Sequence, residues 1–193
     1  MRLLVGLGNP GERYARNRHN VGFMAVDEIV HRHGFSPWRV QFQGAFAQGE
    51  IAGKKVLALK PMTYMNLSGR SVGAAARYYK IAPENVIVFH DELDISPNRF
   101  KVRLGGGTAG HKGLRSIDAH LGNSFWRVRI GIGHPGMREI VEHWVLQDFP
   151  KASAEWLVPM LEAMAIELPL LLAEQDSHFM SKVYARLRPR ALS

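Results

Sequence analysis

Two stretches near the start decide the fold: the apolar run LLVGL at residues 3–7 and VGFMAVDEIVHRH at residues 21–33. The first is short and is followed by Gly8-Asn9-Pro10-Gly11, a pattern typical of a buried β-strand that ends in a turn. The second has apolar side chains at helical spacing. The segment between them is polar and ends in His19-Asn20. The chain is therefore expected to begin with a strand, a polar loop and a helix.

The same alternation of strand and helix continues along the chain. Further strands are predicted at residues 45–51, 55–59, 85–90, 99–104 and 126–133, and further helices at residues 67–80, 112–121, 152–173 and 178–187. The runs on either side of Ala52-Gly53-Lys54 indicate a hairpin, so parallel and antiparallel strands should occur together. We expect an α/β fold, with residues 1–193 in a single domain whose mixed, mostly parallel, twisted sheet is flanked by helices. Its C-terminal helical segment should run from about residue 151 to residue 193.

The charge balance favours a polyanionic partner. Lys and Arg number 25 against 17 Asp and Glu, a formal net charge of +8. Nucleic acid is the first candidate for such a partner, although a positive face that is merely solvated has the same composition. The tail from His178 to Ser193 adds Lys182, Arg186, Arg188 and Arg190 and has no acidic residue. This tail either contacts a phosphate backbone or forms a solvated helix face.

Features that the sequence lacks exclude several kinds of site and location. The chain has no cysteine, so disulfides, thiolate metal sites and a cysteine nucleophile are excluded, and a reducing cytosol is the expected location. The first residues do not have the pattern of a signal peptide, and no segment approaches the roughly 20 apolar residues that a membrane span requires. We therefore expect a cytoplasmic protein that does not enter a membrane.

Two glycine-rich motifs suggest nucleotide binding, but their context argues against it. GLGNPG (6–11) matches G-x-G-x-x-G after a strand, yet residues 12–19 separate it from the predicted helix. The acidic partners Asp27 and Glu28 fall inside that helix and not at the end of a second strand. In LGGGTAGHKG (104–113), His111 stands where a Walker loop requires lysine. This second loop is either an anion-binding nest before a helix or a flexible connection with positive φ.

Polar residues that follow the predicted strands are the candidates for catalysis. His19 is the candidate general base, because an imidazole titrates near neutrality and this one lies in a polar loop. Asp91 follows the apolar run VIVF (86–89), where a carboxylate must be hydrogen-bonded or paired, as in one that orients a base. Asn9, Asn66 and His111 follow three different strands and offer uncharged donors for a water and an oxyanion. Each of the three alone is more often a cap or turn residue.

The absence of two sequence motifs bears on the nucleophile and on metal binding. No G-x-S-x-G string is present, so water is the expected nucleophile. The chain has nine histidines, but no H-E-x-x-H string. Neighbouring strand residues such as His90 and Asp91 point to opposite faces of a sheet. We therefore expect no metal.

Taken together, these loops resemble the bacterial peptidyl-tRNA hydrolase family. The resemblance rests on five strings in a fixed order: GLGNPGERYARNRHNVG (6–22), KPMTYMNLSG (60–69), HDELD (90–94), LGGGTAGHKGLRSI (104–117) and RVRIGIGHPG (127–136). It covers the chain to about residue 150, and the helical remainder is similar in length and character. The resemblance implies a monomeric, single-domain α/β enzyme without metal or cofactor. Its substrate would be peptidyl-tRNA, and its reaction the hydrolysis of the ester bond between a peptide and the 3′ end of the tRNA.

The resemblance also implies roles for single residues. His19 would activate the water and Asp91 would orient His19. Asn9 and Asn66 would place the water and the substrate carbonyl. The other residues that the resemblance assigns to substrate or tRNA are Tyr14 in support of the first loop, Met65 and His111 along the cleft, and Arg103 and Arg129 toward the tRNA.

One position departs from the family pattern. The family usually has asparagine after the histidine of the glycine loop, whereas this chain has Lys112. This lysine either contacts a tRNA phosphate or is a solvated side chain. Two other classes of protein also stay open, a nucleotide-dependent oxidoreductase and a non-catalytic RNA-binding module. Cofactor absorbance would reveal the first, and hydrolysis of peptidyl-tRNA would exclude the second.

Overall fold

The computed structural model describes residues 1–188. Its strands are β1 (Arg2–Gly6), β2 (Arg39–Gln41), β3 (Gly44–Ile51), β4 (Lys54–Pro61), β5 (Val86–Glu92), β6 (Phe100–Leu104) and β7 (Trp126–Gly131). Its helices are α1 (Val21–Arg32), α2 (Ser68–Tyr79), α3 (Lys112–Leu121), α4 (Val141–Val145), α5 (Ala154–Leu172) and α6 (Asp176–Leu187). Among these described residues, no helix combines the length and the apolar character needed to cross a membrane.

The described strands form one sheet in the order β2-β3-β4-β1-β5-β7-β6. The four neighbours β4, β1, β5 and β7 run parallel to one another. The β3–β4 hairpin is antiparallel, and so are the pairings of the two edge strands, β2 with β3 and β6 with β7. The predicted α/β fold with a mixed, mostly parallel sheet is confirmed.

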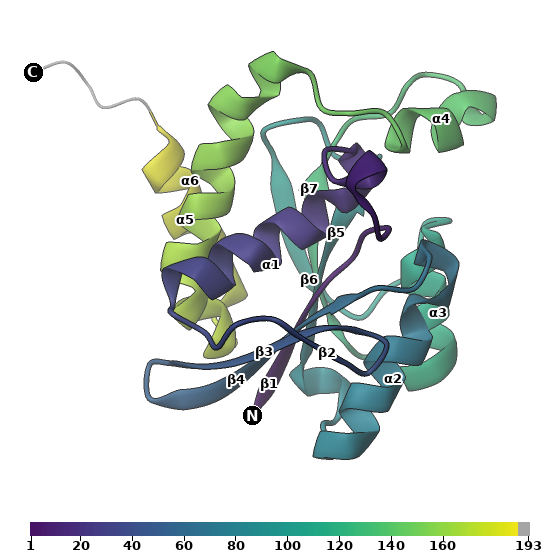
Figure 1. Ribbon diagram of the computed structural model, residues 1–193. Coiled ribbons are helices and arrows are strands. Elements are labelled where there is room, and N and C mark those ends of the chain that lie inside the picture. The colour runs from purple at the N-terminus through teal and green to yellow at the C-terminus, as the bar shows by residue number, and fades with distance from the viewer. Residues whose placement is uncertain (189–193) are drawn as a thin grey trace, which may run out of the picture.

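Helices cover both faces of the sheet, because alternate residues of the central strands point to opposite sides. Ile87 and Phe89 of β5 belong to the apolar core beneath α1, α5 and α6. Val86 and Val88 belong to a second core beneath α2 and α3. In Figure 1 the two groups of helices lie on opposite sides of the sheet. All seven residues of β5 are buried, as expected of a strand that is covered on both faces.

Helix α1 approaches the sheet closely at Gly22. A Cβ on this residue would overlap the carbonyl oxygen of Phe89 in β5 and the backbone of Leu7 after β1. The opposing Gly6 would in turn overlap the carbonyl group of Gly22. Only glycine allows backbone to meet backbone at this distance. The contact fixes the first turn of α1, which begins two residues after His19, against the ends of β1 and β5.

Helix α5 continues through Pro169, although proline lacks the N–H that would bind the carbonyl group four residues earlier. That carbonyl group belongs to Ala165, and Nε2 of His33 lies 2.7 Å from its oxygen. His33 follows α1 directly. The imidazole therefore replaces the missing helical donor and joins the end of α1 to the middle of α5.

The structure differs from the sequence prediction at several element boundaries. The predicted strand 85–90 continues to Glu92, so Asp91 lies within β5 and not in the loop after it. Two short elements were not predicted, β2 with three residues and α4 with five. Neither has a sequence period long enough to recognise. The helix predicted from residue 178 begins two residues earlier, at Asp176.

Candidate active site

A cleft of about 860 Å³ opens where β1, β4, β5 and β7 end. Loops from these strand ends lie together because the carboxyl ends of parallel strands meet at one edge of a sheet. The predicted site residues that line the cleft are Asn9, His19, Met65, Asn66, Asp91, His111 and Lys112. Three other predicted residues, Tyr14, Arg103 and Arg129, are not among the lining residues.

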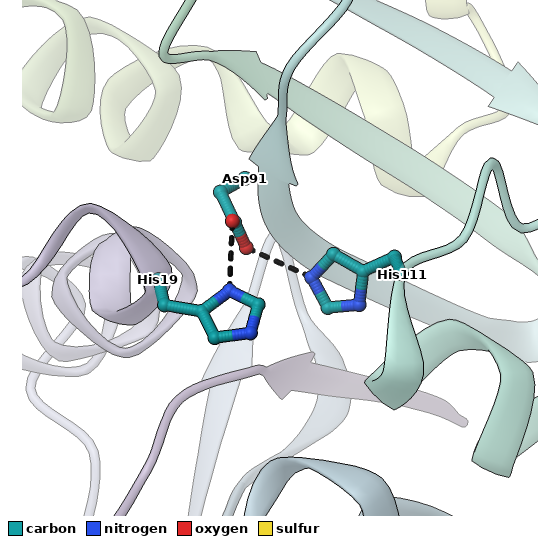
Figure 2. A group of neighbouring side chains, drawn as sticks. All are labelled: His19, Asp91 and His111. Carbon is teal, nitrogen blue, oxygen red and sulfur yellow. Dashed lines mark hydrogen bonds and ion pairs between the residues drawn. The ribbon is translucent and has the colours of Figure 1, made fainter. Parts of the chain in front are cut away.

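Asp91 is at the centre of the site, with a histidine on either side (Figure 2). Its Oδ2 lies 2.8 Å from Nδ1 of His19, and its Oδ1 lies 2.8 Å from Nε2 of His111. Burial alone would raise the pKa of the carboxyl group, which is 3% exposed. The charges and N–H groups of His19 and His111 outweigh burial and hold the pKa of Asp91 well below its usual range. The carboxylate therefore accepts one hydrogen bond at each oxygen.

His111 has its second nitrogen turned away from the cleft and into the start of α3. As the N-cap residue of α3, it accepts hydrogen bonds at Nδ1 from the backbone N–H groups of Gly113 and Leu114, at 3.1 and 3.3 Å. A nitrogen that accepts from N–H groups carries no proton, so the ring proton of the neutral imidazole is assigned to Nε2. His111 therefore donates to Asp91. Both of its nitrogens are occupied within the protein.

His19 has the complementary arrangement. It lies in a single 3-10 turn, Arg18–Asn20, directly before α1. Its Nδ1–H donates to Asp91, because a carboxylate can only accept. Its Nε2 makes no hydrogen bond to any described residue, and it is not among the buried atoms that lack a partner. This nitrogen is therefore open to the cleft.

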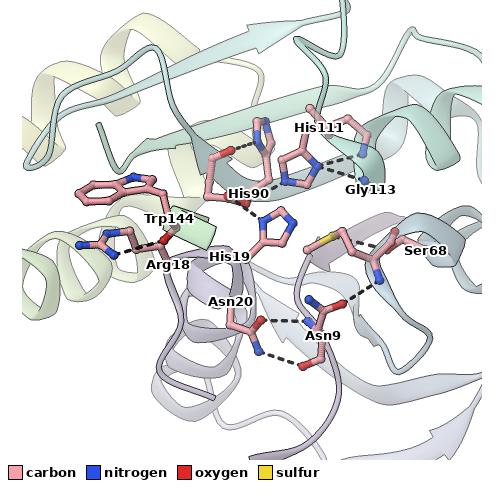
Figure 3. Close-up of polar contacts among 12 residues, drawn as sticks. Asn9, Arg18, His19, Asn20, Ser68, His90, His111, Gly113 and Trp144 are labelled. Carbon is pink, nitrogen blue, oxygen red and sulfur yellow. Dashed lines mark hydrogen bonds and ion pairs between the residues drawn. The ribbon is translucent and has the colours of Figure 1, made fainter. Parts of the chain in front are cut away.

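Asn9 is held at its backbone by Asn20 and at its side chain by Met65 (Figure 3). Its backbone N–H donates to Oδ1 of Asn20 at 2.9 Å, and Nδ2 of Asn20 donates to the carbonyl oxygen of Asn9 at 3.0 Å. The backbone N–H of Met65 donates to Oδ1 of Asn9 at 2.9 Å. With Oδ1 occupied, the Nδ2 of Asn9 is the group presented to the cleft. Asn66, next to Met65, is exposed and lines the same cleft.

The architecture and sequence both match a known family. The family model described as Peptidyl-tRNA hydrolase matches residues 3–190. The chain belongs to this family. The peptidyl-tRNA hydrolase of Rhodospirillum centenum is 56% identical over 189 residues, which cover 98% of this chain and 83% of that protein. That of Rhodospirillum rubrum is 58% identical, with coverage of 98% and 78%.

Solved structures of peptidyl-tRNA hydrolases have the same fold. The crystal structure of the enzyme from Acinetobacter baumannii matches with a TM-score of 0.90 and 41% identity, covering 96% of this chain and 95% of that one. As a member of the peptidyl-tRNA hydrolase family, this chain is a hydrolase that acts on ester bonds. The resemblance seen in the sequence is confirmed.

The arginines predicted to meet tRNA in this peptidyl-tRNA hydrolase fold differ in their surroundings. Arg103 is exposed on β6 and packs against Gly106, where an added Cβ would come within 2.8 Å of its guanidinium group. Arg129 donates to Oε1 of Glu92 at 2.9 Å and is partly buried. Lys112 is exposed at the first position of α3. In the C-terminal tail, Arg186 pairs with Glu167 at 2.7 Å, while Arg190 lies outside the described residues.

Several residues that shape the site were not singled out from the sequence. Arg18 lies over the ring of Trp144, with its Cζ 3.6 Å from the ring centroid, and connects α4 to the turn that carries His19. Arg127 is 2% exposed and donates to the carbonyl oxygens of Gly106, Asn123 and Phe125, which holds the glycine loop. The partners in these contacts are separated by up to 126 residues. No local sequence pattern indicates such pairs.

His19, Asp91 and His111 also have the geometry of a potential metal site, which the sequence spacing did not predict. Their three candidate ligand atoms lie within 4.8 Å of one another. A metal would need an unprotonated ring nitrogen on each histidine. Nε2 of His111 carries the proton while Nδ1 caps α3. The hydrogen bonds therefore account for the cluster, and His111 is not available as a ligand in this arrangement.

Proposed function

We propose that this chain hydrolyses the ester bond of peptidyl-tRNA, with His19 as the general base. The observation that carries the proposal is the hydrogen bond between Nδ1 of His19 and the buried carboxylate of Asp91. It leaves Nε2 unprotonated and open to a cleft large enough for the end of the substrate. Asp91 holds the ring in this tautomer and stabilises the imidazolium that forms during the reaction.

The reaction proceeds through a tetrahedral intermediate. Nε2 of His19 takes a proton from water as the water oxygen attacks the ester carbonyl carbon. The intermediate collapses by breaking the bond to the ribose oxygen of the tRNA. His19 returns the proton to that oxygen, which leaves a free 3′-terminal hydroxyl group and a peptide with a free carboxyl group. Asp91 accepts from His19 throughout and is not itself protonated.

The amide groups of Asn9 and Asn66 place the water and stabilise the oxyanion. Nδ2 of Asn9 is held in the donor orientation because the backbone N–H of Met65 occupies Oδ1. A donor that is fixed before the reaction stabilises developing charge without a cost of reorganisation. Asn66 supplies a second amide from the loop after β4.

Basic residues at the cleft and beyond it bind the tRNA backbone. Contacts to phosphate are independent of base sequence, which suits an enzyme that accepts many tRNAs. Lys112 at the edge of the cleft and the exposed Arg103 present their full charge. Arg129 shares its charge with Glu92 and contributes less net charge. Tyr14 supports the first loop from the turn Glu12–Tyr14, where Arg13 stacks on its ring.

We propose further that the enzyme works as a cytoplasmic monomer in which residues 1–193 form one folding unit. The hydrogen bonds of His19, Asp91 and His111 leave no need for a metal or another cofactor. The lack of cysteine suits a reducing compartment. Light scattering of the purified protein would test the monomer, and activity after dialysis against a chelator would test the independence from metal.

The decisive experiment measures the release of labelled peptide from peptidyl-tRNA under single-turnover conditions. His19→Ala should reduce the rate by about 10²–10⁴-fold, the usual loss when a general base is removed. His31→Ala is the matched control, because His31 is an exposed histidine on α1 outside the cleft. Wild-type hydrolysis by a folded His19→Ala variant would contradict the proposed mechanism.

A further inference from the structure

We propose that His111 is a positioning residue that fixes the orientation of the side chain at position 91, and through that side chain the position of His19. The inference rests on the proposed role of His19 as the base. It starts at the N-terminus of α3, where the backbone N–H groups of Gly113 and Leu114 both point at Nδ1 of His111. Backbone amides donate under all ordinary conditions and cannot act as acceptors. They therefore set the direction of the hydrogen bond between His111 and Asp91.

Three contacts connect α3 to the cleft. Nδ1 of His111 accepts, so the ring proton is on Nε2 and is donated to Oδ1 of Asp91 at 2.8 Å. The carboxylate has its second oxygen 2.8 Å from Nδ1 of His19, and that nitrogen must carry a proton. The lone pair of His19 is consequently on Nε2, which is open to the cleft. The rings of His111 and His19 lie on either side of the carboxylate, as Figure 2 shows.

The geometry separates this role from direct contact with substrate. The side chain of His111 is 8% exposed, and neither of its nitrogens is free to bind a substrate group. His111 lines the cleft while both of its ring nitrogens are bonded within the protein. Without His111, Oδ1 of a carboxylate that is 3% exposed would lose its hydrogen-bond partner. Replacement of His111 should therefore lower kcat more than it changes KM.

The variant Asp91→Asn tests the direction of the hydrogen bonds between position 91 and the two histidines. Asparagine has one acceptor and one donor where aspartate has two acceptors. Because His111 can only donate, the oxygen of the new amide must face His111 and its NH₂ group must face Nδ1 of His19. That contact is favourable only if Nδ1 of His19 is unprotonated, which moves the ring proton to Nε2 and removes the base. A wrong tautomer of this kind costs about 10⁴-fold in a serine protease triad.

Removing the donor of His111 should reverse part of this loss. His111→Asn keeps a good N-cap acceptor for α3, but its shorter side chain does not reach Asp91. In the double variant Asp91→Asn/His111→Asn, the new amide at position 91 is free to turn its oxygen toward His19. We expect the double variant to hydrolyse peptidyl-tRNA at least about tenfold faster than Asp91→Asn alone. A purely structural role for His111 predicts the opposite, since two damaging substitutions would add.

The matched control is Asp91→Asn combined with His120→Asn. His120 lies on the same helix, is exposed and contacts the carbonyl oxygen of Ser116 instead of Asp91. This control should be no faster than Asp91→Asn alone. The single variant His111→Asn should lower kcat by about 10–100-fold, the range seen when a group that orients a metal-bound histidine is lost, with little change in KM.

Nitrogen-15 NMR of the histidine rings at pH 8 reads the tautomers directly and requires no substrate. In the wild type, the proton should be on Nε2 of His111 and on Nδ1 of His19. In Asp91→Asn it should move to Nε2 of His19, and in the double variant it should return to Nδ1. A proton on Nδ1 of His111 in the wild type, or a double variant no faster than the single one, would overturn the inference. Failure of His19→Ala to slow hydrolysis would instead overturn the proposed function, so the two are distinguishable.

Discussion

Replacement of His90 by asparagine should make the free energy of unfolding less sensitive to acid. His90 is 1% exposed, its Nδ1–H donates to the carbonyl oxygen of Asp91 at 2.8 Å, and its Nε2 is buried without a partner in the described residues. Burial, and then the neighbouring ring of His111, lower the pKa of His90 from 6.5 to about 3. The imidazole is therefore neutral in the folded protein throughout the range in which an unfolded histidine titrates.

The sign and size of the change in the free energy of unfolding with pH follow from the difference in bound protons between the unfolded and the folded chain. Between pH 6.5 and about pH 3 the unfolded chain binds a proton at His90 and the folded chain does not. The contribution to stability is fully present above pH 6.5 and is lost as the pH falls toward the folded pKa. Each pH unit within this interval costs roughly 1.4 kcal/mol, so the step from pH 7 to pH 5 should cost about 2 kcal/mol.

The assay is urea unfolding followed by tryptophan fluorescence at pH 5, 6, 7 and 8. Asparagine keeps a donor for the carbonyl oxygen of Asp91 but does not titrate. The other histidines are common to both proteins and cancel. The wild type should lose about 2 kcal/mol more than His90→Asn between pH 7 and pH 5. A control, His31→Asn at an exposed position, should follow the wild type. Equal losses for wild type and His90→Asn would refute the reasoning.

Three further predictions concern the cleft, the tRNA contact and the fold. Asn9→Asp keeps the acceptor for the backbone N–H of Met65 but replaces the Nδ2 donor with a charged oxygen. The rate of single-turnover hydrolysis should therefore fall by about 10²–10³-fold while the protein stays folded, and a rate within about threefold of wild type would contradict this role of Asn9. Lys112→Asn should reduce the slope of log affinity against log salt by about 0.7–0.9, with turnover at saturation little changed; an unchanged slope would mean that Lys112 is simply solvated. Gly22→Ala should lower the free energy of unfolding by at least about 2–3 kcal/mol in urea titrations, because the new Cβ overlaps backbone atoms. The control Gly73→Ala on α2 should be nearly neutral, because its Cβ meets the flexible end of Arg77.

The pairing of the two histidines also explains how one buried carboxylate serves two different neighbours. His111 and His19 have opposite tautomers, because Nδ1 of His111 accepts from the start of α3 whereas Nδ1 of His19 donates to Asp91. The glycine loop is held by Arg127 through the carbonyl oxygen of Gly106, and it leads directly into His111. The position of this loop and the protonation of His19 are therefore physically connected, although the loop does not contact His19.

The alternation of strands and helices could be predicted from the sequence, because the period of apolar residues reports which face of an element is buried. The same reasoning brought Asn9, Asn66 and Asp91 to one edge, since the carboxyl ends of parallel strands meet there. His111 reaches this edge through the loop after β6, which is antiparallel to β7. The boundaries of α3 were predicted correctly, whereas α4 was missed because five residues do not establish a period.

The tertiary structure alone decided which atom of each side chain faces the cleft. The sequence cannot show that Met65 occupies Oδ1 of Asn9, or that α3 occupies Nδ1 of His111, because a hydrogen bond forms only when distant backbone groups come within about 3 Å. The pair Arg18 and Trp144 is another such case, as its two members lie on separate segments with no shared pattern. Local patterns encode the faces of helices and strands, and the packing of those faces sets the direction of each hydrogen bond in the site.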